Sequence, residues 1–254
     1  MPASSDQIIA ELDRLLEPQR FEDYGPNGLQ VPGPHSVSRI ATGVSAHAEL
    51  FERAAAERAE LLIVHHGLFW GPGFRVIDGT LKRRLQLLFD SGIGLAAYHL
   101  PLDAHPELGN NALIARALGA EHLERFALHH DEPIGILAHL PGTGLAASEL
   151  FARVAETTAR EPLVFEEGPQ TVRTLAIVSG AGADYLRDGA AAGAQAFLTG
   201  EPAERVMAEA REAGLHFIAA GHYATETFGV RRLGEHLAQR FALAHTFLDV
   251  PNPV

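Results

Sequence analysis

Short apolar runs alternate with amphipathic segments along the first part of the chain. The runs typical of strands lie at residues 40–45, 61–65 and 93–98, and the helical patterns at residues 8–16, 46–60, 81–90 and 110–118. Strands that are buried on both faces of a parallel sheet read as continuous apolar runs, and helices connect them. This part of the chain is therefore predicted to contain parallel βαβ units.

The same alternation returns toward the C-terminus, after a stretch with a less regular pattern. Strands are predicted at residues 174–179, 196–199, 216–220 and 244–250, and helices at residues 184–192, 203–213 and 223–241. We expect an α/β fold of two similar, pseudo-repeated lobes with parallel-rich sheets. The lobes are predicted over residues 1–125 and 171–254, with a connector or subdomain over residues 126–170.

Polar side chains follow several of these apolar runs. Those that can bind a metal are His65 and His66, then Asp103 shortly after His99, and finally His222 and Glu226. In open α/β sheets, ligands bind beyond the carboxyl ends of the strands. These residues are therefore candidates for a site.

Each candidate also has an ordinary structural interpretation. One of the two adjacent histidines can be a packed core residue, and Asp103 can be a turn or helix-capping residue. His222 and Glu226 have the i, i+4 spacing that also arises between surface residues of a helix. The metal interpretation therefore depends on all of them occurring together.

Three histidines and two carboxylates exceed what one tetrahedral zinc ion needs. They fit two divalent ions that share a bridging carboxylate and lie between the two predicted lobes. Nitrogen and oxygen ligands of this kind suit Zn, Mn, Fe or Co. Two such ions generate a metal-bound hydroxide at neutral pH, which is the nucleophile of many metal-dependent hydrolases.

The composition narrows the chemistry further. None of the 254 residues is cysteine, which excludes disulfides and thiolate metal sites, so any metal must be held by nitrogen and oxygen. The net charge of −12 disfavours a general nucleic-acid surface, which needs positive charge to neutralise phosphates. No apolar stretch is long enough to span a bilayer, and we expect a cytoplasmic protein without membrane contact.

Two further motifs have competing interpretations. Residues 179–182 (SGAG) follow a predicted strand and resemble a truncated dinucleotide-binding loop, although Tyr185 stands where the third glycine belongs. His129, His130 and Asp131 lie between predicted elements and are either a solvated loop or another metal site. Phe69 and Trp70 follow the histidine pair closely and are either packed or at the rim of a site for an aromatic substrate.

The ordered set of motifs resembles one family over essentially the whole chain. The motifs are residues 23–30 (DYGPNGLQ), 64–69 (VHHGLF), 98–105 (YHLPLDAH), 199–201 (TGE) and 221–226 (GHYATE). They resemble the short form of the Nif-three-like family, whose members are often labelled GTP cyclohydrolase I type-two homologues.

The resemblance implies a two-lobed α/β fold, a toroidal homohexamer and a dinuclear metal centre. By motif, the ligands would be His65, His66, Asp103, His222 and Glu226, with Glu226 as the bridge. His99 and Glu201 would lie nearby as catalytic residues that orient ligands or move protons.

Three hypotheses of function follow. The first is a metal-dependent hydrolase that acts on a nucleotide or a related phosphorylated small molecule, by ring opening of GTP or by phosphoester cleavage. The second is a non-catalytic protein that binds or delivers metal, and the third is a regulatory oligomeric scaffold. Metal content and turnover by variants of the ligand residues discriminate among them.

Overall fold

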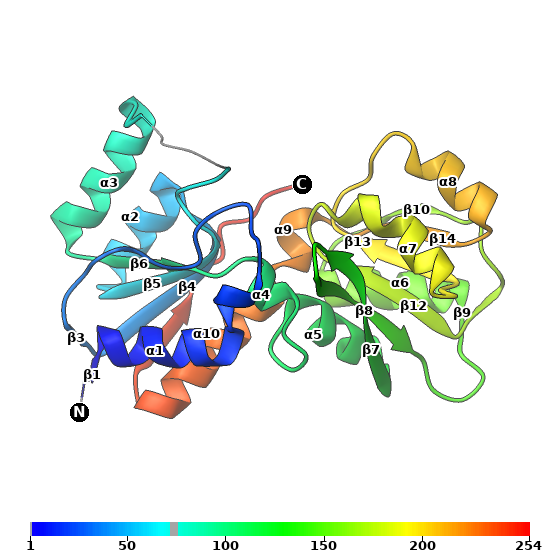
Figure 1. Ribbon diagram of the computed structural model, residues 1–254, viewed down its shortest axis with the longest axis horizontal. Coiled ribbons are helices and arrows are strands. Elements are labelled where there is room, and N and C mark those ends of the chain that lie inside the picture. The colour runs from blue at the N-terminus through cyan, green and yellow to red at the C-terminus, as the bar shows by residue number, and fades with distance from the viewer. Residues whose placement is uncertain (1, 72–75) are drawn as a thin grey trace. The chain divides into compact units, whose positions relative to one another are not determined.

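A computed structural model describes residues 2–71 and 76–254, and the chain divides into two compact units (Figure 1). The first unit contains the described residues up to Leu102 together with Gly229–Val250. The second contains Asp103–Phe228 and Pro251–Val254. The chain therefore crosses between the units at Leu102–Asp103, at Phe228–Gly229 and at Val250–Pro251.

A five-stranded sheet forms the centre of the first unit. Its elements are β1 (Ala3–Ser4), α1 (Ser5–Leu16), η1 (Pro18–Arg20), β2 (Gly28–Val31), β3 (Ser36–Val37), β4 (Arg39–Ser45), α2 (Ala48–Ala56), β5 (Leu61–His66), α3 (Gly79–Ser91), β6 (Gly94–Ala97), most of α10 (Thr227–Phe241) and β15 (Ala244–Phe247). The strand order is β15-β4-β5-β6-β2, in which the first four strands are parallel and β2 is antiparallel to β6. Helices α2 and α3 lie on one side of the sheet and α1 and α10 on the other (Figure 1).

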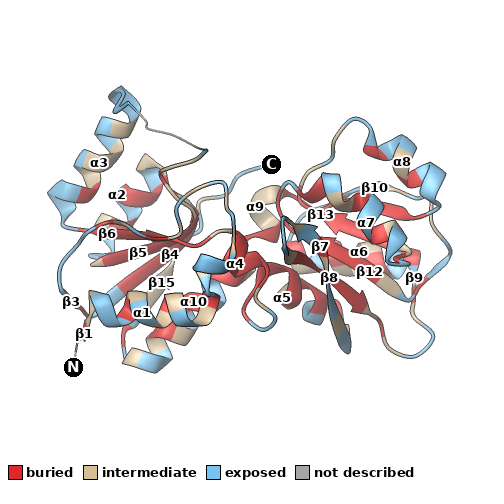
Figure 2. Cartoon of the chain, in the orientation of Figure 1, coloured by how far each residue is buried: buried red, intermediate tan, exposed pale blue. Residues whose placement is uncertain are grey.

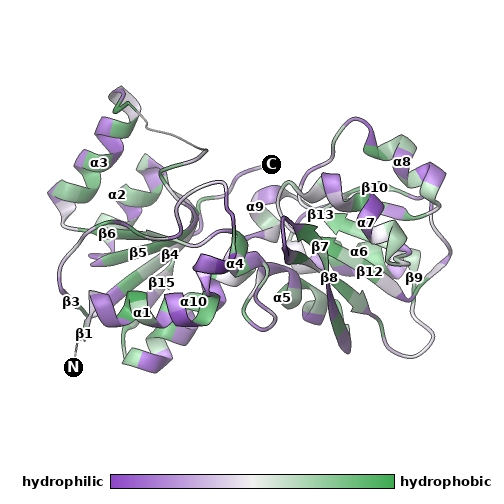
Figure 3. Cartoon of the chain, in the orientation of Figure 1, coloured by the Kyte–Doolittle hydropathy of each residue, from purple (hydrophilic) through white to green (hydrophobic). Residues whose placement is uncertain are grey.

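Burial on both faces explains the unbroken apolar run of β5. Leu62 and Val64 pack against α2 and α3 in one cluster, whereas Leu61 and Ile63 alternate to the other face, and all four are buried. The central strands are accordingly drawn as buried in Figure 2 and as mostly hydrophobic in Figure 3.

The second unit is built on a six-stranded mixed sheet. Its elements are α5 (Asn110–Ala117), β7 (His122–His129), β8 (Glu132–His139), β9 (Leu145–Ala146), α6 (Ala147–Thr158), β10 (Leu163–Phe165), β11 (Thr171–Val172), β12 (Thr174–Val178), η2 (Gly182–Tyr185), α7 (Leu186–Ala191), β13 (Ala196–Thr199), α8 (Val206–Ala213), β14 (His216–Ala219) and α9 (His222–Thr225). The strand order is β10-β14-β13-β12-β8-β7, with β12, β13 and β14 parallel. The remaining helix, α4 (Leu100–Asp103), spans the boundary between the units.

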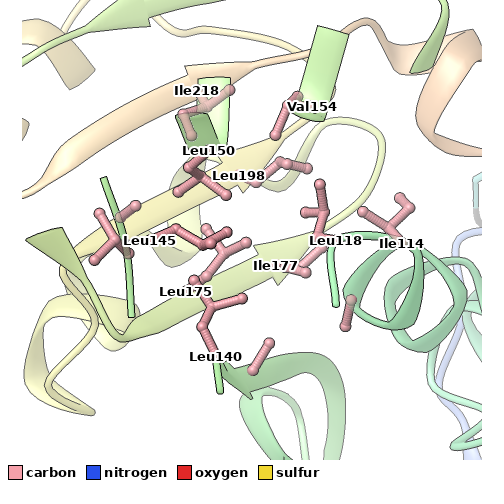
Figure 4. Packing of buried hydrophobic residues seen from close by; sticks show 14 of the residues in the cluster. Ile114, Leu118, Leu140, Leu145, Leu150, Val154, Leu175, Ile177, Leu198 and Ile218 are labelled. Atoms are coloured by element: carbon pink, nitrogen blue, oxygen red, sulfur yellow. The ribbon is translucent and has the colours of Figure 1, made fainter. Parts of the chain in front are cut away.

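The core of the second unit lies between this sheet and helices α5 and α6. Leu175, Ile177 and Leu198 from the strands pack with Leu150 of α6 and Ile114 of α5, as Figure 4 shows. All five side chains are fully buried, so this cluster fixes the sheet beneath the ends of β12 and β13.

The predicted α/β class is confirmed, since both sheets contain three or more parallel strands connected by helices. The units differ in their bounds from the predicted lobes. The stretch over residues 126–170 belongs to the second unit, because β8 pairs with β12 and β10 pairs with β14 in the same sheet. The pseudo-repeat of the two lobes stays a prediction.

Two predicted helices differ from those observed. The helix predicted over residues 46–60 is α2, which ends at Ala56 because Arg58 adopts a left-handed conformation with φ of 57°. The helix predicted over residues 223–241 is interrupted at Glu226, where α9 ends and α10 begins. Within the described residues, no helix is both long and apolar enough to cross a membrane.

Candidate metal centre

Three histidines gather at the carboxyl ends of β5 and β6 in the first unit. The ring of His65 lies 4.8 Å from that of His66 and 4.9 Å from that of His99, measured between centroids. Each of the three offers one ring nitrogen, and these nitrogens lie within 4.8 Å of one another. Parallel strands end at the same edge of the sheet, which is why residues from two strands meet here.

The hydrogen bond of His65 determines which of its nitrogens can bind a metal. Its Nδ1 lies 3.0 Å from the carbonyl oxygen of Tyr98, and a carbonyl can only accept, so Nδ1–H donates. Nε2 of the neutral ring then carries the lone pair. A backbone carbonyl on the other ring nitrogen is the usual partner of a metal-binding histidine.

His66 is held at the last position of β5 by the neighbouring strand. Its Nδ1 lies 3.0 Å from the hydroxyl oxygen of Ser45, the residue paired with it at the end of β4. The next residue, Gly67, has no room for a side chain, since a Cβ there would lie 2.3 Å from the Gln30 amide nitrogen. Gly67 therefore lets the Gln30 side chain pack directly against the backbone that follows the two histidines.

The loop before β2 holds His99. Nδ1–H of His99 donates to the Asp23 carboxylate over 2.7 Å, and its backbone N–H donates to the Asn27 side-chain oxygen over 2.8 Å. The other Asp23 oxygen accepts from the N–H of Leu100 and from the Asn27 amide. Burial would raise the pKa of the Asp23 carboxyl, but the hydrogen bonds from His99, Asn27 and Leu100 outweigh burial and hold this pKa below its ordinary value.

A small pocket opens beside these histidines within the first unit. Its lining includes His65, His99, Asn27 and Trp70. The Trp70 ring lies edge-on to His99, with centroids 5.0 Å apart, and its Nε1–H donates to the carbonyl of Gly67. Trp70 therefore forms part of the pocket wall. Of the two interpretations given for it above, packing or a position at the rim of a site, this place agrees with the second.

Asp103 in the second unit is held by a buried polar network. One of its carboxylate oxygens accepts from the Asn110 amide over 2.8 Å and from the Ser179 hydroxyl over 3.0 Å. Asn111 accepts from the N–H of Ser179 and donates to the carbonyls of Asp103 and Ile134. Sequence reasoning missed Asn110, Asn111 and Ser179 in this role.

His222 lies between two carboxylates of the second unit. Its Nε2 lies 3.1 Å from Glu226 Oε1, and its Nδ1–H donates to Glu201. Burial lowers the pKa of His222, but Glu226 and Glu201 together outweigh burial and raise this pKa to about 9. The i, i+4 pair predicted between His222 and Glu226 therefore forms a contact, and Glu226 is 2% exposed.

Gly180 gives the loop after β12 its close approach to Glu226. A Cβ on Gly180 would lie 2.2 Å from Glu226 Oε1, and the residue adopts a φ of +64°. Its carbonyl accepts from the N–H groups of Gly200 and Glu201. Residues 179–182 resembled a dinucleotide-binding loop in sequence. The structure gives another reason for the glycine at position 180, which is that it leaves space for the buried carboxylate of Glu226.

The other histidine pair of the sequence analysis lies in a hairpin turn. His129 ends β7, and His130 and Asp131 form the turn that leads to β8. His129 Nδ1 lies 3.0 Å from the Tyr185 hydroxyl.

The structure thus places the seven predicted site residues in two groups. His65, His66 and His99 lie together in the first unit, and Asp103, Glu201, His222 and Glu226 lie in the second. Imidazole nitrogens are preferred ligands of divalent transition ions, and the three ring nitrogens of the first group lie close enough together to hold one. Asp23 was missed, although it opens the first motif of the family resemblance.

Known proteins resemble this chain over its whole length. The sequence profile of the Duf34/NIF3 (NGG1p interacting factor 3) family matches residues 3–253. A Pseudomonas aeruginosa protein named GTP cyclohydrolase 1 type 2 homolog is 42% identical over 253 residues, covering 100% of both chains. The solved structure of TTHA1606 from Thermus thermophilus matches with a TM-score of 0.90 and 42% identity, covering 99% of this chain and 100% of that one. Protein ybgI, described as of unknown function, matches with a TM-score of 0.91 and 39% identity over 99% and 100% of the two chains.

Proposed function

Since the chain belongs to the Duf34/NIF3 family, we propose that it is a dinuclear metal-binding protein and a metal-dependent hydrolase. The proposed ligands are His65, His66, Asp103, His222 and Glu226. The proposed substrate is a nucleotide or a related phosphorylated small molecule, a class that the name of the Pseudomonas relative suggests. The homohexamer implied by the family resemblance is part of this proposal.

The observation that carries the proposal is the histidine cluster at the ends of β5 and β6. The carbonyl of Tyr98 fixes His65 in the tautomer that a metal ligand needs, before any ion is present. Without a ligand, placing three imidazoles so close together would have little purpose. Clustered and oriented imidazoles are the arrangement expected of a metal site.

Two of the proposed ligands lie close in sequence to the points where the chain passes from one unit to the other. Asp103 is the first residue of the second unit, four positions after His99. Glu226 lies three positions before Gly229, where the chain returns to the first unit. Two of the proposed ligands from the second unit are therefore adjacent to the points of covalent connection.

Divalent ions bound by these residues would supply Lewis acidity and lower the pKa of a water molecule. Asp23 fixes the proton of His99 on Nδ1, which leaves Nε2 to exchange a proton with a substrate in the pocket. Glu201 accepts from Nδ1–H of His222 and so orients that ligand. Trp70 lies edge-on to His99 with ring centroids 5.0 Å apart and so restricts the orientation of that imidazole.

The proposal is tested by metal content and turnover together. Purified protein is loaded with Zn²⁺, Mn²⁺, Fe²⁺ or Co²⁺, and bound metal is measured by elemental analysis and located by anomalous scattering. Formate release from GTP and phosphate release from a phosphoester panel are then assayed. Glu226→Gln is the test variant, and Glu235→Gln, at an exposed glutamate paired with Arg232, is the matched control.

We expect two ions per subunit at this centre in the wild type and in the control, and at most half as many there in Glu226→Gln, with loss of any hydrolysis. Unchanged metal content in Glu226→Gln would show that the ligand set is wrong. Full metal content without turnover on any substrate would overturn the hydrolase proposal and favour metal storage or delivery.

A further inference from the structure

A second cluster of metal-binding side chains lies on strands β7 and β8, within the second unit. His122 and His139 are directly opposite each other in the antiparallel register of these strands. Glu124 is two residues along β7 from His122 and so projects from the same face. None of the steps proposed above uses these three residues.

The three side chains already converge on one point. Glu124 Oε1 lies 2.9 Å from His139 Nε2 and 3.4 Å from His122 Nε2. The two imidazole rings lie 5.3 Å apart between centroids and are tilted by 31°. Each residue offers one ligand atom, and the three atoms lie within 4.8 Å of one another.

These separations are close to those between the ligands of a bound ion. Zinc binds histidine nitrogen and carboxylate oxygen at about 2.0–2.2 Å, so neighbouring ligand atoms of a tetrahedral site lie about 3.3–3.6 Å apart. The 3.4 Å separation falls in this range, whereas the 2.9 Å separation is that of a hydrogen bond between His139 and Glu124, which must lengthen by about 0.4 Å to admit an ion. Small side-chain rotations are sufficient to admit an ion, because all three side chains are partly exposed.

We propose that His122, Glu124 and His139 form a separate binding site for one divalent transition ion, with Zn²⁺ as the ion of choice. Two imidazoles and one carboxylate favour Zn²⁺ over the hard ions Mg²⁺ and Ca²⁺, which take oxygen ligands. Three protein ligands leave coordination positions open to water. Solvent can reach these positions, because the three side chains are partly exposed and β7 is the edge strand of its sheet.

The site has a practical consequence for the metal count of the protein. Zinc bound by the hairpin strands adds to whatever the proposed dinuclear centre binds. The zinc ion on the hairpin strands remains when the dinuclear centre is emptied, because the two sites share no ligand. Elemental analysis of the wild type would then give one zinc ion per chain more than the dinuclear centre holds.

The test measures Zn²⁺ per chain by equilibrium dialysis at micromolar free zinc. The variants are His139→Ala, Glu124→Gln and, as matched control, His35→Ala, which removes a histidine that is 79% exposed and lies outside the cluster. All are measured in the wild-type chain and in the Glu226→Gln background. Ring nitrogen signals of His122 and His139 in NMR spectra report binding at the hairpin directly.

We expect His139→Ala to bind one zinc ion fewer than the wild type and His35→Ala, in both backgrounds. Glu124→Gln keeps a hydrogen-bond acceptor but loses the charge, so its zinc dissociation constant should rise at least several-fold. Equal zinc counts in His139→Ala and His35→Ala, or no response of the two histidine rings to zinc, would show an ordinary surface hydrogen-bond cluster. Circular dichroism checks that the variants are folded, which their surface positions favour.

Discussion

Replacing Gly180 with alanine tests whether the carboxylate of Glu226 is held where the structure has it. Gly180 has a φ of +64°, and a Cβ there would lie 2.2 Å from Glu226 Oε1 and 3.2 Å from His222 Nε2. Gly214 has the same φ of +64°, with nothing within 4 Å of a Cβ. Gly214→Ala therefore measures the effect of the left-handed backbone on stability without the steric effect of a close neighbour.

The two substitutions should differ by the cost of displacing Glu226. The left-handed backbone alone costs an alanine about 1–2 kcal/mol, partly offset by the lower entropy of the unfolded chain. Gly180→Ala must in addition move a buried carboxylate by about 1 Å, and overpacking of this kind costs about 1–3 kcal/mol. The additional loss of stability in Gly180→Ala corresponds to a Tm lower by about 2–12 °C for a chain of this length.

The assay is thermal unfolding of both variants, followed by metal content after loading with Zn²⁺. Gly214→Ala should keep the metal content of the wild type, whereas Gly180→Ala should lose metal together with the additional stability. Equal melting temperatures for the two variants would refute the close packing of Glu226 against Gly180. Normal metal content in Gly180→Ala would refute the role of Glu226 as a ligand.

Three further outcomes are expected. Glu11→Gln should cost about 1 kcal/mol at neutral pH by urea unfolding. The hydrogen bond from Arg14 holds the pKa of Glu11 at about 2 against the effect of burial. The difference in the free energy of unfolding between the two proteins should therefore vanish as the pH falls from 4.5 toward 2 and the carboxylate of the folded protein is protonated. A difference that stays constant over this pH range would contradict this. Asn111→Ala should lower the free energy of unfolding by about 3 kcal/mol or more, because it removes partners of three buried backbone groups. Ser179→Ala should lower it by about 1 kcal/mol. Equal losses in the two variants would argue against the network. A chelator should lower the melting temperature of the metal-loaded wild type by more than that of metal-loaded Glu226→Gln, and a shift of equal size in both would place the stabilising metal elsewhere.

The strands of both sheets could be predicted because their signal is local. A strand such as β5, which is covered on both faces, must be apolar at every position, so its sequence marks it directly. Strand β2 gave no such signal, since it has only four residues, three of which pair with β6, and turn residues precede them. Strand β7 is an edge strand with mostly exposed side chains, and its pattern resembles that of a loop.

The candidate ligands could be proposed from sequence for the same reason, since each follows an apolar run. Their grouping within each unit depends on which strands are neighbours. His65 and His99 are 34 positions apart in the sequence, and only the parallel pairing of β5 with β6 brings them together.

The residues that escaped prediction orient the candidate ligands rather than bind metal. Asp23 makes hydrogen bonds to the side chain of His99 and to the backbone of Leu100, and Asn111 makes them to the backbone of Asp103, β8 and Ser179. Such side chains supply the hydrogen bonds that buried polar groups can no longer make to water. A single carboxylate or amide can do this for several groups at once. The imidazole of His99 is oriented by Asp23, and the carboxylate of Asp103 is oriented by Asn110 and Ser179, so both orientations come from protein groups alone. If Asp103 is a metal ligand as proposed, binding an ion would need little reorganisation of its carboxylate, which would favour tight binding over easy release.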